Sequence, residues 1–142
     1  MAILPLSAHQ SVAIIGAGIA GLACGQVLAN SGASVTLFDK ARGPGGRMSS
    51  KRRPSATLDL GAQAFSVRDA DFQRAVDTWL SIGCIASWPT STYQASPNGW
   101  QAHNDGKKRY AGAPRMSALT RHLADSLTAL PQAALHTGTS IT

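Results

Sequence analysis

The sequence has no glutamate, only two cysteines, and no apolar run as long as a transmembrane helix. Two cysteines cannot form a disulfide framework, so we expect Cys24 and Cys84 to be reduced thiols in a cytoplasmic protein, with Cys24 buried inside a helix. Met1–Gln10 has neither a basic start nor a long apolar stretch, which argues against a signal peptide. With 142 residues, 44% of them hydrophobic, the chain can form a globular core and is not expected to enter a membrane.

Negative charge is also scarce, because seven aspartates face 13 lysines and arginines and the net charge is +6. Six basic residues lie close together with no acid among them: Lys40, Arg42, Arg47, Lys51, Arg52 and Arg53. Nucleic-acid binding is one meaning of such a cluster. Two other interpretations are favoured: attraction to cofactor phosphates, or a solvated loop. The reasons are that the cluster has no interleaved aromatics and directly follows a strand expected to end at a bound nucleotide. The four histidines are scattered without metal-ligand spacing. We therefore predict neither a nucleic-acid partner nor a metal site.

The most informative stretch is Val12–Asp39, which has the pattern of a βαβ unit. Val12–Ile15 is a short β-branched run, typical of a buried parallel strand. The sequence GAGIAG at Gly16–Gly21 follows directly and opens a helix of about Gly21–Asn30. A second strand of about Ser34–Asp39 ends in an acid. Strand, glycine turn, helix and second strand occur in the order of a dinucleotide-binding fingerprint.

Each glycine of the turn has a physical role in that fingerprint. Gly16 permits the tight turn out of the strand, Gly18 lets a pyrophosphate approach the backbone, and Gly21 lets the helix begin close to the sheet. The free N–H groups at the helix N-terminus would bind the phosphates. Asp39 is placed to accept hydrogen bonds from a ribose hydroxyl pair. The sequence thus predicts an α/β, Rossmann-like fold that binds a dinucleotide.

Further elements are predicted by periodicity and by turn residues. The apolar side of the first helix is expected to include Leu22, Val27 and Leu28. Lys40–Ser50 contains Pro44 and three glycines, which predicts a tight loop with exposed N–H groups and no regular element. The other expected elements are a helix from Asp69 to Gly83 with aromatics in the core, strands at Cys84–Trp88, Gly99–His103 and Lys108–Ala111, a helix with Ser117 as N-cap, and a strand or hairpin at Ala134–His136.

The glycine turn and two later blocks, in this order, resemble motifs of the flavin-containing amine oxidase superfamily. FDKARGPGGRMSS, at Phe38–Ser50, is similar to the Gly-Gly-Arg loop that follows the ribose acid. LDLGAQAFS, at Leu58–Ser66, is similar to the next block, a strand and turn that run toward the flavin ring. The combination is closest to the renalase-like branch, which has aspartate where most relatives have glutamate at the ribose position. A weaker match follows at Gly112–Leu123, where Arg115 stands in place of the glycine that relatives often have.

The resemblance implies a non-covalently bound FAD and a set of residues that bind it. These are Gly16, Gly18, Ala20 and Gly21 at the pyrophosphate, Asp39 at the ribose with Lys40 next to it, Gly46 and Arg47 beside the phosphates, and Gly61, Ala62, Gln63 and Ala64 near the ribityl chain or flavin ring. A strand that ends in a turn is the other interpretation of Asp59–Ala62. No residue is assigned a catalytic role.

The predicted function is an FAD-dependent oxidoreductase, in which a small-molecule substrate gives a hydride to the flavin and O2 reoxidises it. The implied substrates are dihydronicotinamide isomers in the renalase-like branch and amines elsewhere in the superfamily. Two alternatives stay open. One is an NAD-dependent dehydrogenase on the same fold, which the carboxylate of Asp39 suits. The other is a nucleotide-binding module without catalysis.

Relatives of this kind continue well beyond 142 residues, so we expect the chain to be the N-terminal portion of a longer enzyme. Residues 1–83 would form the FAD-binding core with its Gly-Gly-Arg loop. Residues 84–112 would begin an inserted antiparallel β substrate domain, and residues 113–142 would return to the FAD-binding domain. The sequence does not indicate an oligomeric state.

Overall fold

A three-stranded parallel sheet organises the fold in the computed structural model, which describes residues 10–88 and 92–142. Its strands are β1 (Ser11–Ile15), β2 (Ser34–Asp39) and β10 (Ala133–Thr137), in the order β1-β2-β10. The register pairs Ile15 with Phe38, and Phe38 with His136, so the carboxyl ends of all three strands meet at one edge. The strands expected at Val12–Ile15 and Ser34–Asp39 are confirmed. The segment expected to be a strand or a hairpin, Ala134–His136, is part of the parallel strand β10. Nearly all of the segment considered for a signal peptide lies outside the described residues.

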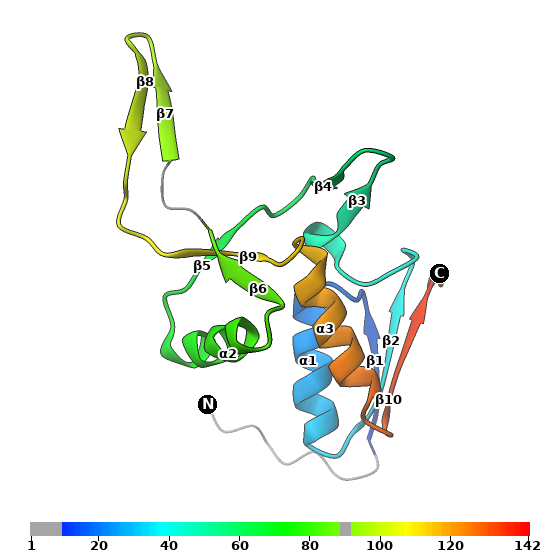
Figure 1. The fold of residues 1–142 in the computed structure, drawn as a ribbon. Coiled ribbons are helices and arrows are strands. Elements are labelled where there is room, and N and C mark those ends of the chain that lie inside the picture. The colour runs from blue at the N-terminus through cyan, green and yellow to red at the C-terminus, as the bar shows by residue number, and fades with distance from the viewer. Residues whose placement is uncertain (1–9, 89–91) are drawn as a thin grey trace.

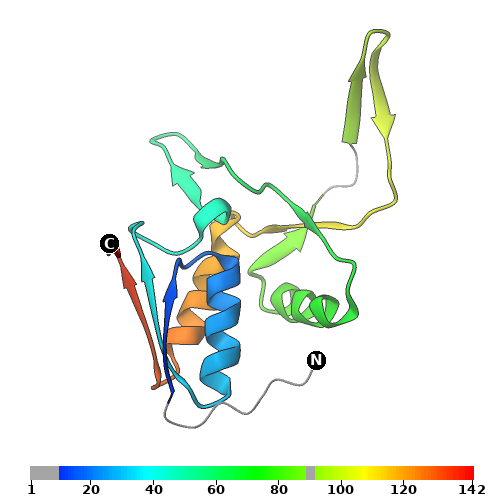
Figure 2. The same ribbon diagram turned by 180° about the vertical axis from the view of Figure 1, so that it is seen from behind.

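Helices α1 (Ile19–Asn30) and α3 (Ser117–Thr128) lie side by side on one face of this sheet (Figures 1 and 2). The core between helices and sheet is made of buried apolar residues: Ala17, Leu22, Ala29, Ala33, Val35, Leu37, Ala124 and Leu127. Gly25 brings α1 close to its neighbours, because a Cβ there would lie 3.1 Å from side-chain atoms of both Leu37 and Leu127. Within the described residues, no helix combines the length and the apolar character needed to cross a bilayer.

The buried face of α1 differs from the expected one. Leu22 is buried as expected, but Val27 is 47% exposed, and Cys24 is exposed. The buried residues of the helix are Leu22, Gly25 and Ala29. At about 100° per residue, both Val27 and Cys24 point away from that face. The expectation of a buried Cys24 is therefore wrong, and Val27 does not belong to the apolar side; both cysteines are free thiols in the structure.

A second layer consists of α2 (Ala70–Ser81) and a small antiparallel sheet. The sheet has the order β5-β9-β6, with β5 at Phe65–Ser66, β9 at Arg109–Gly112 and β6 at Ile85–Ser87. Its core includes the buried residues Met48, Val76, Ile85, Tyr110, Met116 and Leu119. The strands expected at Cys84–Trp88 and Lys108–Ala111 are confirmed.

The signals predicted for α2 are present in the structure. Asp69 is the N-cap, and its carboxylate accepts a hydrogen bond from the N–H of Phe72 at 2.9 Å. Gly83, with φ of +75°, follows the end of the helix. The ring of Phe72 packs against those of Phe65 and Trp79, with centroids 6.0 and 5.9 Å apart. The aromatics of this helix are partly buried and pack against the second core, which agrees with the predicted packing role.

Two hairpins extend from these layers. The shorter joins β3 (Ser50–Arg52) to β4 (Thr57–Asp59), and the longer joins β7 (Thr92–Ser96) to β8 (Gly99–His103) and projects away from the rest of the chain (Figure 1). The strand at Gly99–His103 was predicted, whereas β7 was not predicted as a separate strand.

The loop expected to lack regular structure contains one 3-10 turn, η1 (Gly46–Met48). Gly45 and Gly46 have φ of +137° and +51°, which lets the chain reverse within a few residues. The N–H of Met48 then donates to the carbonyl of Gly45 at 2.9 Å, and the Met48 side chain is buried in the second core. Burial of this one apolar side chain anchors a turn that composition alone did not predict.

The start of α3 also differs from the prediction. Met116 is the N-cap and Ser117 is the first helical residue, so the prediction of Ser117 as N-cap is wrong. The N–H of Ser117 donates to Oγ of Ser50 at 3.0 Å, and the N–H of Met116 donates to Asp59 at 3.1 Å. Side chains of the β3–β4 hairpin therefore bind the N–H groups of the N-cap residue and of the first helical residue.

Candidate functional site

The turn between β1 and α1, at Gly16–Gly21, forms a surface of backbone atoms that we call the cradle. Gly16 has φ of +103°, and its N–H donates to the carbonyl of Phe38 at 2.7 Å. A Cβ added at Gly16 or Gly18 would meet no atom within 4 Å, whereas a Cβ at Gly21 would lie 2.0 Å from the carbonyl oxygen of Gly16. Gly21 is therefore needed for the packing of the turn itself. The space at Gly18 is open to a ligand.

The N-terminus of α1 points its first N–H groups at this cradle. The N-cap is Gly18, which has no side chain to bind these groups, and the first turn contains no acid. The first N–H groups of a helix have no acceptor within the helix, and the helix dipole favours an anion there. Ala20 is exposed on the first turn and presents only a methyl group. The arrangement fits a phosphate group.

Asp39 closes one end of the cradle at the tip of β2. Its Oδ2 accepts the N–H of Ala17 at 2.7 Å, and its Oδ1 accepts the N–H of Ala41 at 2.8 Å. Since a carboxylate offers about four lone-pair sites, these two bonds leave acceptor capacity for sugar hydroxyls. Lys40 is exposed beside it. Asp39 thus fixes the glycine turn and keeps free acceptor sites on its carboxylate.

The Gly-Gly-Arg loop lies directly against the glycine turn. The N–H of Gly45 donates to the carbonyl of Ala17 at 2.8 Å, and Gly45 forms an isolated parallel bridge with Gly18. A Cβ at Gly46 would lie 3.4 Å from Cα of Gly18. Arg47 is exposed immediately after this close approach. Two glycine-rich segments far apart in sequence therefore form one surface, as the sequence motifs predicted.

The third motif joins the second through the backbone of Arg47. The carbonyl oxygen of Arg47 accepts the N–H of Ala62 at 2.9 Å. A Cβ at Gly61 would lie 1.9 Å from that same oxygen, so only glycine fits there. Gln63 is exposed and Ala64 is half-buried as the chain leads into β5. The structure therefore joins the first two motifs directly and the third through Arg47. Among the described residues, no hydrogen bond links Gln63 or Ala64 to the glycine turn.

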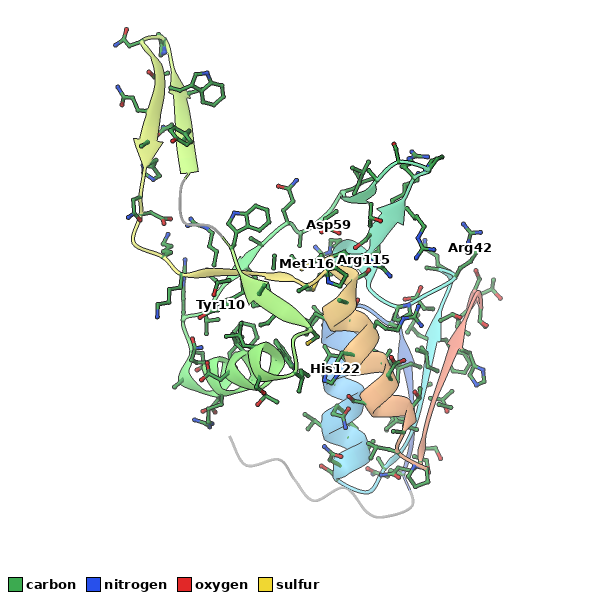
Figure 3. The ribbon with its side chains drawn as sticks, viewed as in Figure 1. Arg42, Asp59, Tyr110, Arg115, Met116 and His122 are labelled. Atoms are coloured by element: carbon green, nitrogen blue, oxygen red, sulfur yellow. The ribbon has the colours of Figure 1, made fainter. Side chains whose placement is uncertain are left out.

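Two polar residues beside the cradle were not predicted as a unit. Ser50 and Asp59 are direct partners in the β3–β4 register, and the Ser50 hydroxyl donates to the carboxylate of Asp59. Both then bind the start of α3, as described above, and Asp59, Arg115 and Met116 lie together there in Figure 3. The sequence could have predicted this unit only if the hairpin register were known, because the register pairs Ser50 with Asp59.

Groups with shifted pKa values lie outside the cradle. Burial raises the pKa of the Cys84 thiol, which donates a weak hydrogen bond to the carbonyl of Trp79 at 3.6 Å. The guanidinium of Arg109 holds the pKa of Asp105 well below its usual range, through a bidentate contact. In residues 10–88 and 92–142, no group of three or more His, Cys, Asp or Glu side chains is placed to hold a metal ion. The cradle itself is built from backbone, glycine and a single carboxylate.

Comparison with known proteins agrees with this geometry. Residues 14–79 match the family model described as an NAD(P)-binding Rossmann-like domain. The chain is 45% identical over 64 residues to a hydroxyneurosporene desaturase of Rubrivivax gelatinosus, and 41% identical over 58 residues to a 4,4'-diapophytoene desaturase of Staphylococcus haemolyticus. These matches cover 45% and 41% of this chain. The matched part spans only 12% of the length of each desaturase.

A solved structure extends the likeness to most of the chain. An oxidoreductase from Methanosarcina mazei superposes with a TM-score of 0.68 at 11% sequence identity, covering 91% of this chain and 51% of that one. At this identity the similarity concerns the fold. The sheet order, the open glycine turn, the acid at the tip of β2 and the matched family model agree with one another. The chain has a Rossmann-like α/β fold of the dinucleotide-binding kind.

Proposed function

We propose that the chain binds FAD as part of an FAD-dependent oxidoreductase. The observation that carries this proposal is the convergence of three segments on one surface: the glycine turn, Gly45–Arg47, and Gly61–Ala62. A simple dinucleotide fingerprint needs only the first of these. The second contacts the glycine turn and the third contacts the carbonyl of Arg47, and an elongated cofactor with a flavin end would use such additional segments.

The residues divide into three groups along that surface. Asp39, with Lys40 beside it, would accept the adenosine ribose hydroxyls. The pyrophosphate would lie between the α1 N-terminus and the Gly-Gly-Arg loop, contacting Gly16, Gly18, Ala20, Gly21, Gly46 and Arg47. Gly61, Ala62, Gln63 and Ala64 would pass beside the ribityl chain or the isoalloxazine. We assign no catalytic residue, because the proposed role of these groups is only to bind and orient the cofactor.

When bound, FAD supplies two-electron chemistry, accepting a hydride from a substrate and returning electrons to O2. The finer proposal is a renalase-like enzyme of the amine oxidase superfamily that oxidises dihydronicotinamide isomers, with amines as the second substrate class. Residues 84–112 would begin the substrate domain. The desaturase relatives add desaturation as a further class of reaction, but the match spans only 12% of the length of each desaturase.

Two alternatives are kept for specific reasons. An NAD-dependent dehydrogenase is favoured by the carboxylate of Asp39, which suits a free ribose hydroxyl pair. The close approach of Gly46 to Gly18 argues against it, because a Gly-Gly-Arg loop is not part of the simple NAD fingerprint. A nucleotide-binding module without catalysis would need only the cradle.

The absorption spectrum of the purified protein tests the proposal. A bound flavin, released on denaturation and identified as FAD by chromatography, is the expected result; bound NAD instead would support the dehydrogenase. Anaerobic addition of dihydronicotinamides should bleach the flavin, while amines should not. Bleaching by amines alone would replace the renalase-like substrate with an amine. A flavin that no donor reduces would favour the non-catalytic module.

A further inference from the structure

A strongly basic hollow lies between the β3–β4 hairpin, the loop after β2 and the start of α3. Its volume is about 470 Å³. Five cationic side chains line it: Arg42, Lys51, Arg52, Arg115 and Arg121. Figure 3 labels two of them, Arg42 in the loop after β2 and Arg115 beside Met116 at the start of α3. The described residues that line it include no acid.

These cations are not neutralised by the described part of the chain. The ion pairs of residues 10–88 and 92–142 are Arg74–Asp71, Lys107–Asp105 and Arg109–Asp105. None of the five lining cations takes part in them. Asp59, behind Ser50, already accepts two hydrogen bonds, and Asp125 lines the adjoining hollow one helical turn beyond Arg121. Because like charges in one hollow repel, an anion placed among them is stabilised.

The hollow is separate from the dinucleotide cradle. Its lining contains neither the glycine turn nor Asp39, Gly46 or Arg47. The intervening loop has two sides, because a Cβ at Gly46 would face Gly18, whereas a Cβ at Gly45 would lie 3.1 Å from the hydroxyl of Thr120 on α3. The basic cluster of residues 40–53 is thus divided by the fold. Arg42, Lys51 and Arg52 line the hollow, whereas Arg47, which follows Gly46, does not.

We propose that this hollow binds the phosphate group of a small molecule other than the dinucleotide in the cradle. Guanidinium groups offer paired N–H donors that match phosphate oxygens, and four of the five cations are arginines. Ser49 and Thr57 also line the hollow, and their hydroxyl groups can donate hydrogen bonds to phosphate oxygens. A nucleic acid fits less well, since no described aromatic lines the hollow for base stacking.

Inorganic pyrophosphate is the probe, titrated calorimetrically into the purified protein with and without excess FAD. We expect binding in both conditions, weakened by added salt. Arg121→Gln should weaken it about three- to fivefold, the scale of one exposed ionic contact, without changing FAD retention. Arg52→Gln, on β3, should act similarly and provides a second measurement if Arg121→Gln perturbs α3. The matched control Arg74→Gln, on α2, should leave binding unchanged.

Three results would overturn the proposal. Loss of pyrophosphate binding when FAD is added, or in Arg47→Ala, would place the anion in the cradle. Equal pyrophosphate affinity of Arg121→Gln, Arg52→Gln and Arg74→Gln would show that binding depends on the general surface charge and not on the hollow. Tighter binding of a short oligonucleotide, lost in Arg121→Gln, would make nucleic acid the ligand. A protein that binds pyrophosphate in the expected pattern but retains no FAD would contradict the proposed function alone, so the two proposals fail independently.

Discussion

Asp59 accepts a hydrogen bond from the backbone N–H of Met116 at 3.1 Å, across 57 positions of sequence. Its other carboxylate oxygen accepts from the hydroxyl of Ser50, which itself accepts the N–H of Ser117. One carboxylate therefore joins the β3–β4 hairpin to the positive end of the α3 dipole. Met116 and Leu119 are fully buried in the second core, so this junction also holds the first turn of α3 against that core.

Replacement of Asp59 by alanine should lower the free energy of unfolding by about 1–3 kcal/mol, because it leaves the N–H of Met116 and the hydroxyl of Ser50 without their acceptor. The measurement is urea denaturation followed by circular dichroism. Asp71→Ala is the matched control, since its ion pair with Arg74 joins two side chains that are 81% and 73% exposed. Equal stability of the two variants would contradict a structural role for Asp59.

The two glycines of the turn should respond in opposite ways to a single methyl group. Gly21→Ala should unfold or strongly destabilise the protein, because its Cβ would lie 2.0 Å from the carbonyl oxygen of Gly16. Gly18→Ala should fold with a small loss at the N-cap, since its Cβ meets no atom within 4 Å, but should retain less cofactor. Thermal melts and the flavin content of the purified variants separate the two effects. Full flavin retention in a folded Gly18→Ala protein would show that the ligand does not pass over this glycine.

Arg47 should contribute to cofactor affinity and little to stability, because its side chain is exposed and makes no ion pair with a described residue. Arg47→Ala should weaken FAD binding on the order of 1.5–3 kcal/mol, the value of a charge-assisted phosphate contact. Flavin release on dialysis or dilution measures the change. Arg53→Ala, which removes another exposed cation of the same cluster, should retain FAD. Unchanged retention in Arg47→Ala would remove Arg47 from the phosphate site.

Asp39 should affect both binding and folding, which the sequence alone did not indicate. Asp39→Ala removes the acceptor expected for the ribose and also the acceptor for the N–H groups of Ala17 and Ala41. Both FAD retention and the melting temperature should therefore fall. In Asp39→Asn, whose amide keeps one acceptor oxygen, the melting temperature should recover part of the loss. A stable Asp39→Ala protein would mean that the glycine turn does not need this carboxylate.

The sequence predicted the elements that local patterns specify. β1, β2 and the first helix follow from β-branched runs and a glycine turn, and α2 from Asp69 and Gly83. Features set by contacts between distant segments were missed. Cys24 faces solvent because Leu22, Gly25 and Ala29 define the buried face. The N-cap of α3 lies one residue before the expected cap, and the first N–H groups of the helix bind Ser50 and Asp59 of a distant hairpin.

The same limit applies to the candidate site and the basic residues. The resemblance to the amine oxidase superfamily implied that the three motifs lie along one cofactor, and the structure joins the first two directly and the third through Arg47. The separation of Arg42 from Arg47 could not be predicted, because it depends on which side of one loop faces α1 and which faces α3. Nor could Arg115 and Arg121 be added to the cluster, since they lie more than 60 positions from Arg53 in the chain.

The ion pair between Asp105 and Arg109 should make stability depend on pH on the acid side. Arg109 lowers the pKa of Asp105 in the folded state. A group with a lowered folded pKa stabilises the protein above its unfolded value of about 3.9, and this contribution is lost as the pH falls through the folded value. Asp105→Asn should therefore have a lower urea midpoint than the natural protein at pH 7 and pH 5. The difference should shrink at pH 3, where protonation begins to favour the unfolded state of the natural protein.

Asparagine is the informative substitution at this position because its side-chain oxygen can still accept the N–H of Lys107, which Asp105 binds at 3.2 Å. The comparison then isolates the charge. Asp71→Asn serves as the reference, since its exposed pair with Arg74 should give a small difference at every pH. A gap between the natural protein and Asp105→Asn that stays constant or widens from pH 7 to pH 3 would show that the pair does not hold the carboxylate in its charged form.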